Sequence, residues 1–219
     1  IDMQTIGLGG DSEVEINHKG IISLKSNRVI PVSLICTRFP ELIDQLKSRL
    51  SQGMGLARAI RFICLSEGYD SQNMPTSLSH ADLTFLEKMG SGAKVFDDTI
   101  VRASERAQAE RLLDRGLLQV SGLTPSDAAH ALGLQSQWSI EGARLGCLML
   151  GRSHGLISHN DEYIDTGIEA FARLVYDAMV GKSAHCIINQ LAGYNFPLND
   201  PLIHAVTHGD NHFNDLSIM

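Results

Sequence analysis

The sequence lacks the cysteine pattern of a disulfide framework or of a structural zinc site. It has four cysteines among 219 residues, and no two of them form a C-x-x-C pair. Structural zinc and redox sites usually contain such close pairs, whereas an isolated cysteine is most often a buried, nearly apolar side chain. We therefore expect buried thiols at all four positions, Cys36, Cys64, Cys147 and Cys186.

Long apolar runs and an excess of positive charge are also missing. No apolar stretch approaches the roughly 20 residues that span a bilayer. The formal net charge is −7, with 18 Lys and Arg against 25 Asp and Glu. Nucleic acids and anionic membranes attract clustered positive charge, so we expect neither as a partner. With 43% hydrophobic residues the chain can fill one large core or two small ones, and we expect a cytoplasmic globular protein.

A glycine-rich turn at residues 5–12, T-I-G-L-G-G-D-S, is the strongest local pattern. It runs into an alternating strand, with Val14 and Ile16 on one face and Glu13 and Glu15 on the other. Rossmann and P-loop turns are followed by a helix whose N-terminus binds phosphate, so those two fingerprints are excluded. Glycines beside a strand either let backbone amides approach a ligand or form a bulge where a β-carbon would clash. Both interpretations stay open.

Two segments of the chain resemble the hydantoinase/oxoprolinase family, ATP-dependent enzymes that open cyclic amide rings. Residues 5–12 are similar to the family's T-I-G-A-G-G-G-S segment. Residues 122–133, G-L-T-P-S-D-A-A-H-A-L-G, are similar to its G-L-T-P-T-D-A-x-H-x-L-G element and follow at the expected relative position. Asp11 departs from the family pattern, which usually has a third glycine there. The carboxylate suggests a divergent branch with an altered substrate or activity.

The resemblance implies a mixed α+β fold that forms part of an actin-like ATPase domain, of the kind found in sugar kinases and heat-shock ATPases. It also implies ATP and Mg²⁺ as cofactors of the parent protein and a small cyclic amide as substrate. In such enzymes ATP phosphorylates the ring amide oxygen, so that water can attack the carbonyl carbon; the protein supplies positioning, magnesium and aligned amide donors. By this resemblance Asp11 is a candidate catalytic residue, and the candidate cofactor contacts are Gly7, Gly9, Gly10 and Ser12.

The chain lacks other parts that such an ATPase needs. Actin-like ATPases hold the nucleotide between two related halves, each with a D-x-G-G-T phosphate loop, and no such loop occurs here. The sequence also begins at Ile1, directly inside a strand pattern. We therefore expect an internal piece of a longer protein, which binds no cofactor tightly and is inactive alone. Its partners would be the remainder of the parent chain and a hydantoinase B-like subunit.

We expect three regions along the chain. Residues 1–60 form a strand-rich segment with one helix, residues 61–123 a winged-helix-like insertion, and residues 124–219 a helical segment. The first and third regions would belong to the ATPase-like half. In the first region, apolar alternation and turn signals predict a hairpin turn at 17–20, a strand over 29–35 and a helix over 42–53.

The insertion contains clear helix and strand signals. Ser79 and Asp82 have the spacing of a capping box, and Gly90 would end that helix. The pattern then predicts a helix over 104–115, a strand over 117–120 and a turn at 121–122. Helix, helix and short hairpin is the order of a winged helix.

The third region is predicted to be mainly helical. A helix over 138–150 contains Gly142 and Gly146, which allow a neighbouring element to pack closely. Thr166 and Glu169 have the spacing of a capping box for a long helix, and Gly181 would break that helix.

Asp127 and His130 are candidate catalytic residues because they lie three positions apart on one helix face. A carboxylate at this spacing can orient the imidazole, or both can meet one ligand. A structural explanation competes with this one. Thr124 can cap the helix, Pro125 suits its first turn, and Asp127 favours the positive end of the helix dipole.

A second polar group lies near the end of the sequence, where His204, His208, Asp210 and His212 are close together. Histidines four residues apart can bind one metal ion. However, Gly209 weakens a helix there and no H-E-x-x-H arrangement is present. We therefore predict a polar edge and no metal site.

A non-catalytic interaction module is the competing function, because the phosphate loops are missing and Asp11 replaces a glycine. DNA binding through the insertion is the weaker alternative. The arginines of its second helix alternate with carboxylates, so ion pairing within the helix explains them more simply than phosphate contacts. These residues are Arg102, Arg106, Arg111 and Arg115 with Glu105, Glu110 and Asp114.

Overall fold

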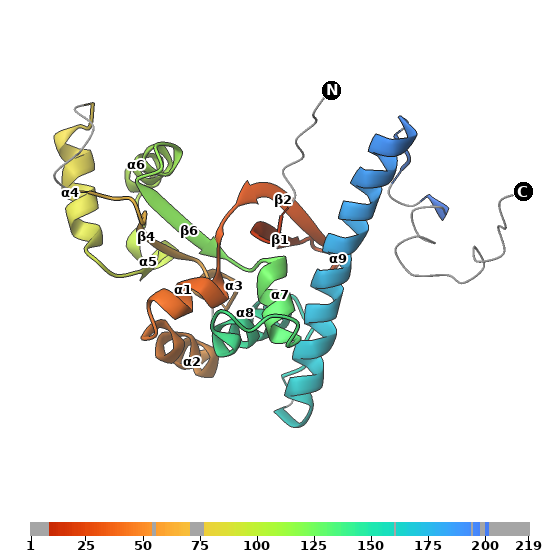
Figure 1. The fold of residues 1–219 in the computed structure, drawn as a ribbon. Coiled ribbons are helices and arrows are strands. Elements are labelled where there is room, and N and C mark those ends of the chain that lie inside the picture. Colours follow the sequence, from red (N-terminus) through yellow and green to blue (C-terminus); the bar gives the residue numbers. More distant parts are fainter. Residues whose placement is uncertain are drawn as a thin grey trace, which may run out of the picture.

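The computed structural model describes residues 9–53, 56–70, 77–159, 161–193, 195–197 and 200–201. Within these residues the fold is mixed α+β, as predicted, with helices packed around two small sheets (Figure 1). One sheet is the β1–β2 hairpin, and the other has the strand order β3-β6-β4-β5.

The hairpin joins β1 (Ser12–Ile16) to β2 (Ile22–Arg28) in antiparallel pairing, and its predicted turn is confirmed. The Asn17 side-chain oxygen accepts hydrogen bonds from the backbone N–H groups of Lys19 and Ile21, and Gly20 has a φ of +75°. The predicted alternation fails at Glu13, which is 8% exposed. The pairing register shifts between Ser12 and Val14, and such a bulge places successive residues on the buried side.

In the four-stranded sheet, β6 pairs in parallel with β3 and antiparallel with β4, and β4 pairs antiparallel with β5. The strand predicted over 117–120 is confirmed, but the turn predicted at Ser121 and Gly122 is wrong. Both residues continue β6, because they pair with Ile30 and Pro31 of β3. The strand bounds are Ile30–Pro31 for β3, Phe62–Leu65 for β4, Lys94–Val95 for β5 and Leu118–Gly122 for β6.

The strand predicted over 29–35 is confirmed only at Ile30–Pro31 (β3) and is wrong from Val32 on, where helix α1 (Val32–Arg38) begins. Its apolar sequence resembles a buried strand. However, the N–H groups of Val32 and Ser33, which begin the helix, donate to the carboxylate of Asp127, which is distant in the sequence. Helix α2 (Leu42–Gln52) is confirmed, and α3 (Leu56–Ala59) follows. The first region thus has three helices where one was predicted.

The insertion contains α4 (His80–Met89), α5 (Phe96–Thr99) and α6 (Ala103–Asp114). The predicted capping box is confirmed: the Ser79 hydroxyl accepts from the N–H of Asp82, and the Asp82 carboxylate accepts from the N–H of Ser79.

Two hydrophobic cores lie on the two sides of the four-stranded sheet. Along β4, Phe62 and Cys64 belong to the larger core, whereas Ile63 between them belongs to the smaller one. The buried members of the smaller core all fall within the range predicted for the insertion. They are Ile63, Phe85, Leu86, Met89, Phe96, Ile100, Ala109, Leu112, Leu118 and Val120. The insertion therefore shares its sheet with the rest of the fold, and its boundaries as a separate domain stay a prediction.

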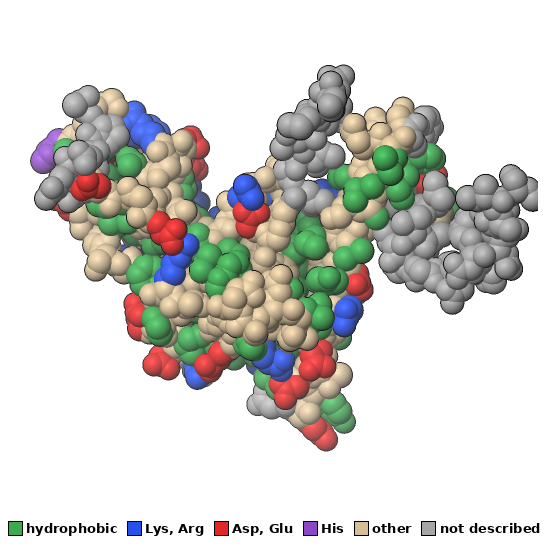
Figure 2. Space-filling view, in the orientation of Figure 1, with side chains coloured by type: hydrophobic (Ala, Val, Ile, Leu, Met, Phe, Trp, Pro, Cys, Tyr) green, Lys and Arg blue, Asp and Glu red, His purple; other side chains and the backbone are tan. Residues whose placement is uncertain are grey.

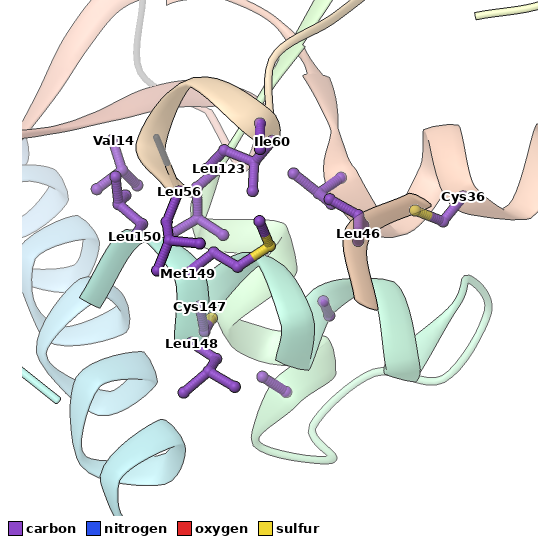
Figure 3. Packing of buried hydrophobic residues seen from close by; sticks show 14 of the residues in the cluster. Val14, Cys36, Leu46, Leu56, Ile60, Leu123, Cys147, Leu148, Met149 and Leu150 are labelled. Atoms are coloured by element: carbon purple, nitrogen blue, oxygen red, sulfur yellow. The ribbon is translucent and has the colours of Figure 1, made fainter. Parts of the chain in front are cut away.

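The larger core is built around α8 (Ile140–Ser153), which packs against α1, α7 (Pro125–Ala131) and α9 (Ile164–Ala192). Figure 3 shows Leu148, Met149 and Leu150 of α8 among the buried side chains of this core. A Cβ atom at Gly142 would lie 2.8 Å from the Cβ of Cys36, and one at Gly146 would lie 3.1 Å from Leu123. The close packing predicted at these two glycines is confirmed.

Helix α9 differs from its prediction in two ways. It begins at Ile164, after a short 3-10 turn (Asp161–Tyr163), so Thr166 lies inside the helix and caps nothing. It also passes through Gly181 without a break. A glycine inside a helix costs only about 1 kcal/mol, and the next residue anchors the helix, because the Lys182 ammonium donates to the Leu24 carbonyl oxygen at 2.6 Å.

The two halves of α9 are packed differently. The first half buries Ile168, Phe171, Ala172 and Val175, whereas no side chain described after Val175 is buried. In Figure 1 this second half extends past the hairpin, beyond the other helices. Among the described residues no helix, α9 included, is both long and apolar enough to cross a membrane.

All four cysteines are free, and three of them are buried as predicted; Cys186 is half-buried. Burial, with a contribution from the Asp127 charge, raises the pKa of the Cys36 thiol to about 12. Burial also raises the pKa of Cys147 and of Cys64. A raised pKa keeps a thiol protonated and weakly reactive, so these cysteines have packing roles.

Candidate functional site

The two segments that carry the family resemblance lie in direct contact. The N–H of Ser126, in the first turn of α7, donates to the Gly10 carbonyl oxygen at 2.9 Å. A Cβ atom at position 10 would lie 2.5 Å from the Ser126 hydroxyl oxygen. A side chain at position 10 would therefore force the Ser126 hydroxyl to move, so glycine suits the close approach of α7.

The turn at residues 9–12 is closed by its own hydrogen bonds. The Ser12 N–H donates to the Gly9 carbonyl oxygen at 3.1 Å, and the Gly9 N–H donates to the Ser12 hydroxyl at 3.3 Å. Ser12 is 1% exposed, so its hydroxyl serves the turn. Gly7, another predicted cofactor contact, lies outside the described residues.

Asp11 lies at the edge of this turn and is the predicted catalytic residue nearest the surface. Its carboxylate forms an ion pair with the Arg28 guanidinium, with 2.7 Å between Oδ2 and Nε. Its backbone carbonyl accepts from the Val29 N–H at 3.0 Å. These contacts fasten the turn to the end of β2 and leave the Asp11 carboxylate facing a groove.

Asp127 is fully buried and binds two helix N-termini at once. Its carboxylate accepts from the N–H groups of Val32 and Ser33 at 3.1 and 2.7 Å and from the Ser33 hydroxyl at 2.6 Å. It also accepts from the N–H and the hydroxyl of Thr124, at 2.9 and 3.0 Å, which completes the predicted start of α7. Burial raises the pKa of the Asp127 carboxyl, and the hydrogen bonds from Ser33 and Thr124 oppose this effect.

His130 is also fully buried, and its hydrogen bonds join two backbone groups. Its Nε2 accepts from the Trp138 N–H at 3.2 Å, so Nδ1 carries the proton and donates to the Ser126 carbonyl oxygen at 2.7 Å. The imidazole also stacks on the Trp138 indole, with 5.1 Å between ring centroids. Asp127 and His130 thus share a helix but bind different partners. A direct catalytic role for either stays a prediction. In the structure His130 positions Ser126 and Trp138, whereas Asp127 holds the starts of α1 and α7.

Ser126 and Trp138 border a groove of about 810 Å³, which lies between the insertion and the rest of the fold. One wall comes from the glycine turn, the end of β2, β3, α1 and α7, and the other from α5 and α6, with β6 between them. Figure 2 shows the molecular surface hollowed between the insertion and the hairpin.

Four arginines from four different parts of the chain line this groove: Arg28, Arg38, Arg61 and Arg106. The groove could not be predicted from the sequence, because no spacing pattern connects these arginines. The sequence pattern predicted only ion pairs within the helix for the arginines in and around α6. The structure shows pairs to neighbouring helices instead, with Arg106 on Asp97 and Arg111 on Asp82.

The sequence also contains a G-x-S-x-G string at residues 151–155. This string marks a nucleophile when the serine lies on a sharp turn from a strand into a helix. Here Ser153 is the last residue of α8, and its hydroxyl donates to the Leu150 carbonyl oxygen at 2.7 Å. The string therefore forms no nucleophile elbow.

No group of three or more metal-ligating side chains is present in the part of the chain that the structure describes. His204, His208, Asp210 and His212 lie outside that part. Comparison of the chain with protein-family models, with curated proteins and with solved structures finds no match. The family resemblance thus rests on the two segments that meet at Gly10 and Ser126.

Proposed function

We propose that this chain is part of an ATP-dependent enzyme that opens cyclic amide rings, and that the groove is one wall of its active site. The observation that carries the proposal is the hydrogen bond between Ser126 and Gly10. It joins the two family-like segments, which are more than a hundred residues apart in the sequence, at the edge of one groove. A shared site explains why both segments occur in one chain.

The glycine turn does not fit a phosphate and Mg²⁺ site by itself. The Gly9 N–H and the Ser12 hydroxyl are hydrogen-bonded to each other, and the space beside Gly10 is taken by Ser126. The Asp11 carboxylate is paired with Arg28. In this proposal the remainder of a longer, cytoplasmic parent chain binds ATP and Mg²⁺, and the residues described here shape the wall that faces the substrate.

The test is ADP formation by the complete parent polypeptide with Mg²⁺, in the presence and absence of 5-oxoproline, hydantoin and N-methylhydantoin. Substrate-stimulated ADP release is the expected result. Absence of stimulation, with folded protein and a hydantoinase B-like subunit supplied, contradicts the proposal.

Asp11 can be tested in the same assay. Asp11→Gly restores the residue usual in the family but removes the ion pair with Arg28, and Asp11→Asn keeps the size of the side chain. Glu15→Ala is the matched control, because Glu15 is an exposed carboxylate on the same hairpin. If Asp11 contacts the reacting groups, Asp11→Asn lowers turnover by tenfold or more, on the order of one lost charge-assisted hydrogen bond, while Glu15→Ala has no effect. Equal turnover in Asp11→Asn and Glu15→Ala would mean that Asp11 has only a structural role.

A non-catalytic interaction module is the second candidate, and the exposed second half of α9 favours it. Its apolar side chains include Ile187 and Leu191, which are 59% and 83% exposed. Under this alternative the parent binds a partner and releases no ADP with any of the three ring compounds.

A further inference from the structure

We propose that the insertion side of the groove binds an oxyanion of a small molecule, with Arg61 and Arg106 as its ligands. The inference rests on the proposed function only in treating the groove as part of an active site. It gives the insertion a role in ligand binding, in place of the DNA binding that its predicted winged-helix order suggested.

Arg61 and Arg106 each pack on the same aromatic ring, that of Phe96. The Arg61 guanidinium carbon lies 5.2 Å from the centroid of the Phe96 ring, and that of Arg106 lies 5.7 Å from it. Cation–π packing fixes a guanidinium in place without using its N–H donors. Phe96 is itself buried in the smaller core, so both cations pack on the surface of that core.

The guanidinium groups of Arg61 and Arg106 have N–H donors that are not hydrogen-bonded to the nearby carboxylates. The other two arginines of the groove make close ion pairs, Arg28 with Asp11 and Arg38 with Glu67, each at 2.7 Å. In contrast, Arg61 lies 3.8 Å from Glu13 and Arg106 lies 3.6 Å from Asp97, beyond hydrogen-bonding distance. The Arg61 Nε is buried and has no hydrogen-bond partner.

A second residue with an unpartnered buried atom lines the same groove. The Gln119 side-chain oxygen, from β6, is buried and accepts no hydrogen bond. Buried polar atoms without partners are uncommon, because each costs free energy until a ligand or water satisfies it. An oxyanion that satisfies the arginines and an adjacent N–H or O–H group that donates to Gln119 would complete the site.

The carboxylates of the groove limit the charge of the ligand. Asp11, Glu110 and Asp114 line it together with the four arginines. A carboxylate with one negative charge therefore meets less repulsion than a doubly charged phosphate. This difference gives the two ligand types different expected affinities.

The test is NMR titration of the chain, without ATP, with acetate, glycolate and inorganic phosphate at constant ionic strength. Glycolate carries a hydroxyl donor beside its carboxylate and acetate does not. We expect groove amides to shift with glycolate at millimolar concentration, typical of a small anion, and to respond more weakly to acetate and to phosphate. Tighter binding of phosphate than of glycolate would overturn both the preference for a singly charged carboxylate and the role of Gln119. The groove would then be a site for phosphate.

Arg106→Gln and Arg61→Gln should each weaken glycolate binding about tenfold, the order of one charge-assisted hydrogen bond. Arg58→Gln is the matched control, since Arg58 approaches the same Asp97, at 3.8 Å, but is 80% exposed and does not line the groove. Retained amide spectra show that each variant is folded, and Arg106→Lys provides a second variant that keeps the charge. Equal weakening by Arg58→Gln, or no groove shift with any of the three anions, overturns the inference.

Because no ATP is present, this titration fails or succeeds independently of ADP formation. Binding without substrate-stimulated ADP release would keep the oxyanion site and reject the ring-opening activity.

Discussion

The two cores on either side of the four-stranded sheet are held together by different interactions. In the larger core, the buried Asp127 carboxylate binds the N–H groups of Val32 and Ser33, which lie 95 and 94 positions before it in the sequence. Around the smaller core, the Lys88–Glu105 and Arg111–Asp82 pairs, both at 3.3 Å, keep their cations about half exposed.

The difference predicts unequal stability on the two sides of the groove. Exposed ion pairs contribute about 0–1 kcal/mol each, whereas a buried hydrogen-bonded carboxylate is costly to remove. The wall that contains the glycine turn should therefore be rigid, and the insertion wall should open first.

Asp127→Ala should have the largest effect, because it leaves the first N–H groups of α1 and the N–H of Thr124, the N-cap of α7, without their acceptor. We expect a loss of about 4 kcal/mol in the free energy of unfolding, measured by urea denaturation. Asp177→Ala, which removes an exposed carboxylate of α9, is the control and should change stability by less than about 0.5 kcal/mol. Similar stability in both variants would mean that Asp127 does not hold the larger core together.

Leu112→Ala should destabilise the insertion without opening the larger core. Leu112 is fully buried in α6, and such a truncation costs about 2–5 kcal/mol. Hydrogen exchange should show faster exchange in α4 and α6 while α7 and α8 stay protected. Leu46→Ala in α2 is the matched change in the larger core. If Leu112→Ala speeds exchange equally in both cores, the molecule is one cooperative unit and the comparison fails.

The two capping boxes allow a like-for-like test. Ser79→Ala should cost about 1 kcal/mol. Thr124→Ala should cost about 2 kcal/mol, because it also removes a buried partner of Asp127. Urea denaturation of both variants measures the difference, and equal losses would show that burial of the second cap adds nothing.

Acid should loosen the insertion before the larger core. The Ser79 hydrogen bond holds the pKa of Asp82 below its ordinary value, and the backbone N–H of Arg102 does the same for Glu105. A carboxyl group with a lowered pKa stabilises the folded state at pH values above its ordinary pKa. This stabilisation is lost as the pH falls through the pKa of the group in the folded state. Asp127 has a raised pKa, so its protonation does not oppose folding in the same way. Hydrogen exchange below about pH 4 should therefore show the insertion opening first, and simultaneous opening would contradict this.

The sequence predicted those parts of the fold that depend on neighbouring residues. The Asn17 turn, the Ser79 box and the start of α7 at Thr124 all follow from short-range hydrogen bonds. Helix α1 was predicted as a strand because the acceptor for its first N–H groups is Asp127, far away in the sequence.

The candidate site was predicted only in part, for the same reason. The glycine turn and α7 carry sequence motifs, and the structure brings them together. The other wall could not be predicted, because Arg61, Phe96 and Arg106 meet only through the packing of three separate segments. The capping box predicted at Thr166 is wrong, because packing extends α9 back to Ile164. A capping sequence can also lie inside a helix, as Thr166 does here.

The shared acceptor of α1 and α7 also constrains how this sequence can change. Because Ser33, Thr124 and Asp127 form one buried network, a substitution at one position alters the cost of a substitution at the others. A descendant that loses the carboxylate without replacing the two hydroxyls keeps unsatisfied donors in its core. We therefore expect these three positions to covary among distant relatives, so a search for Ser33, Thr124 and Asp127 as a set should identify relatives that overall similarity misses.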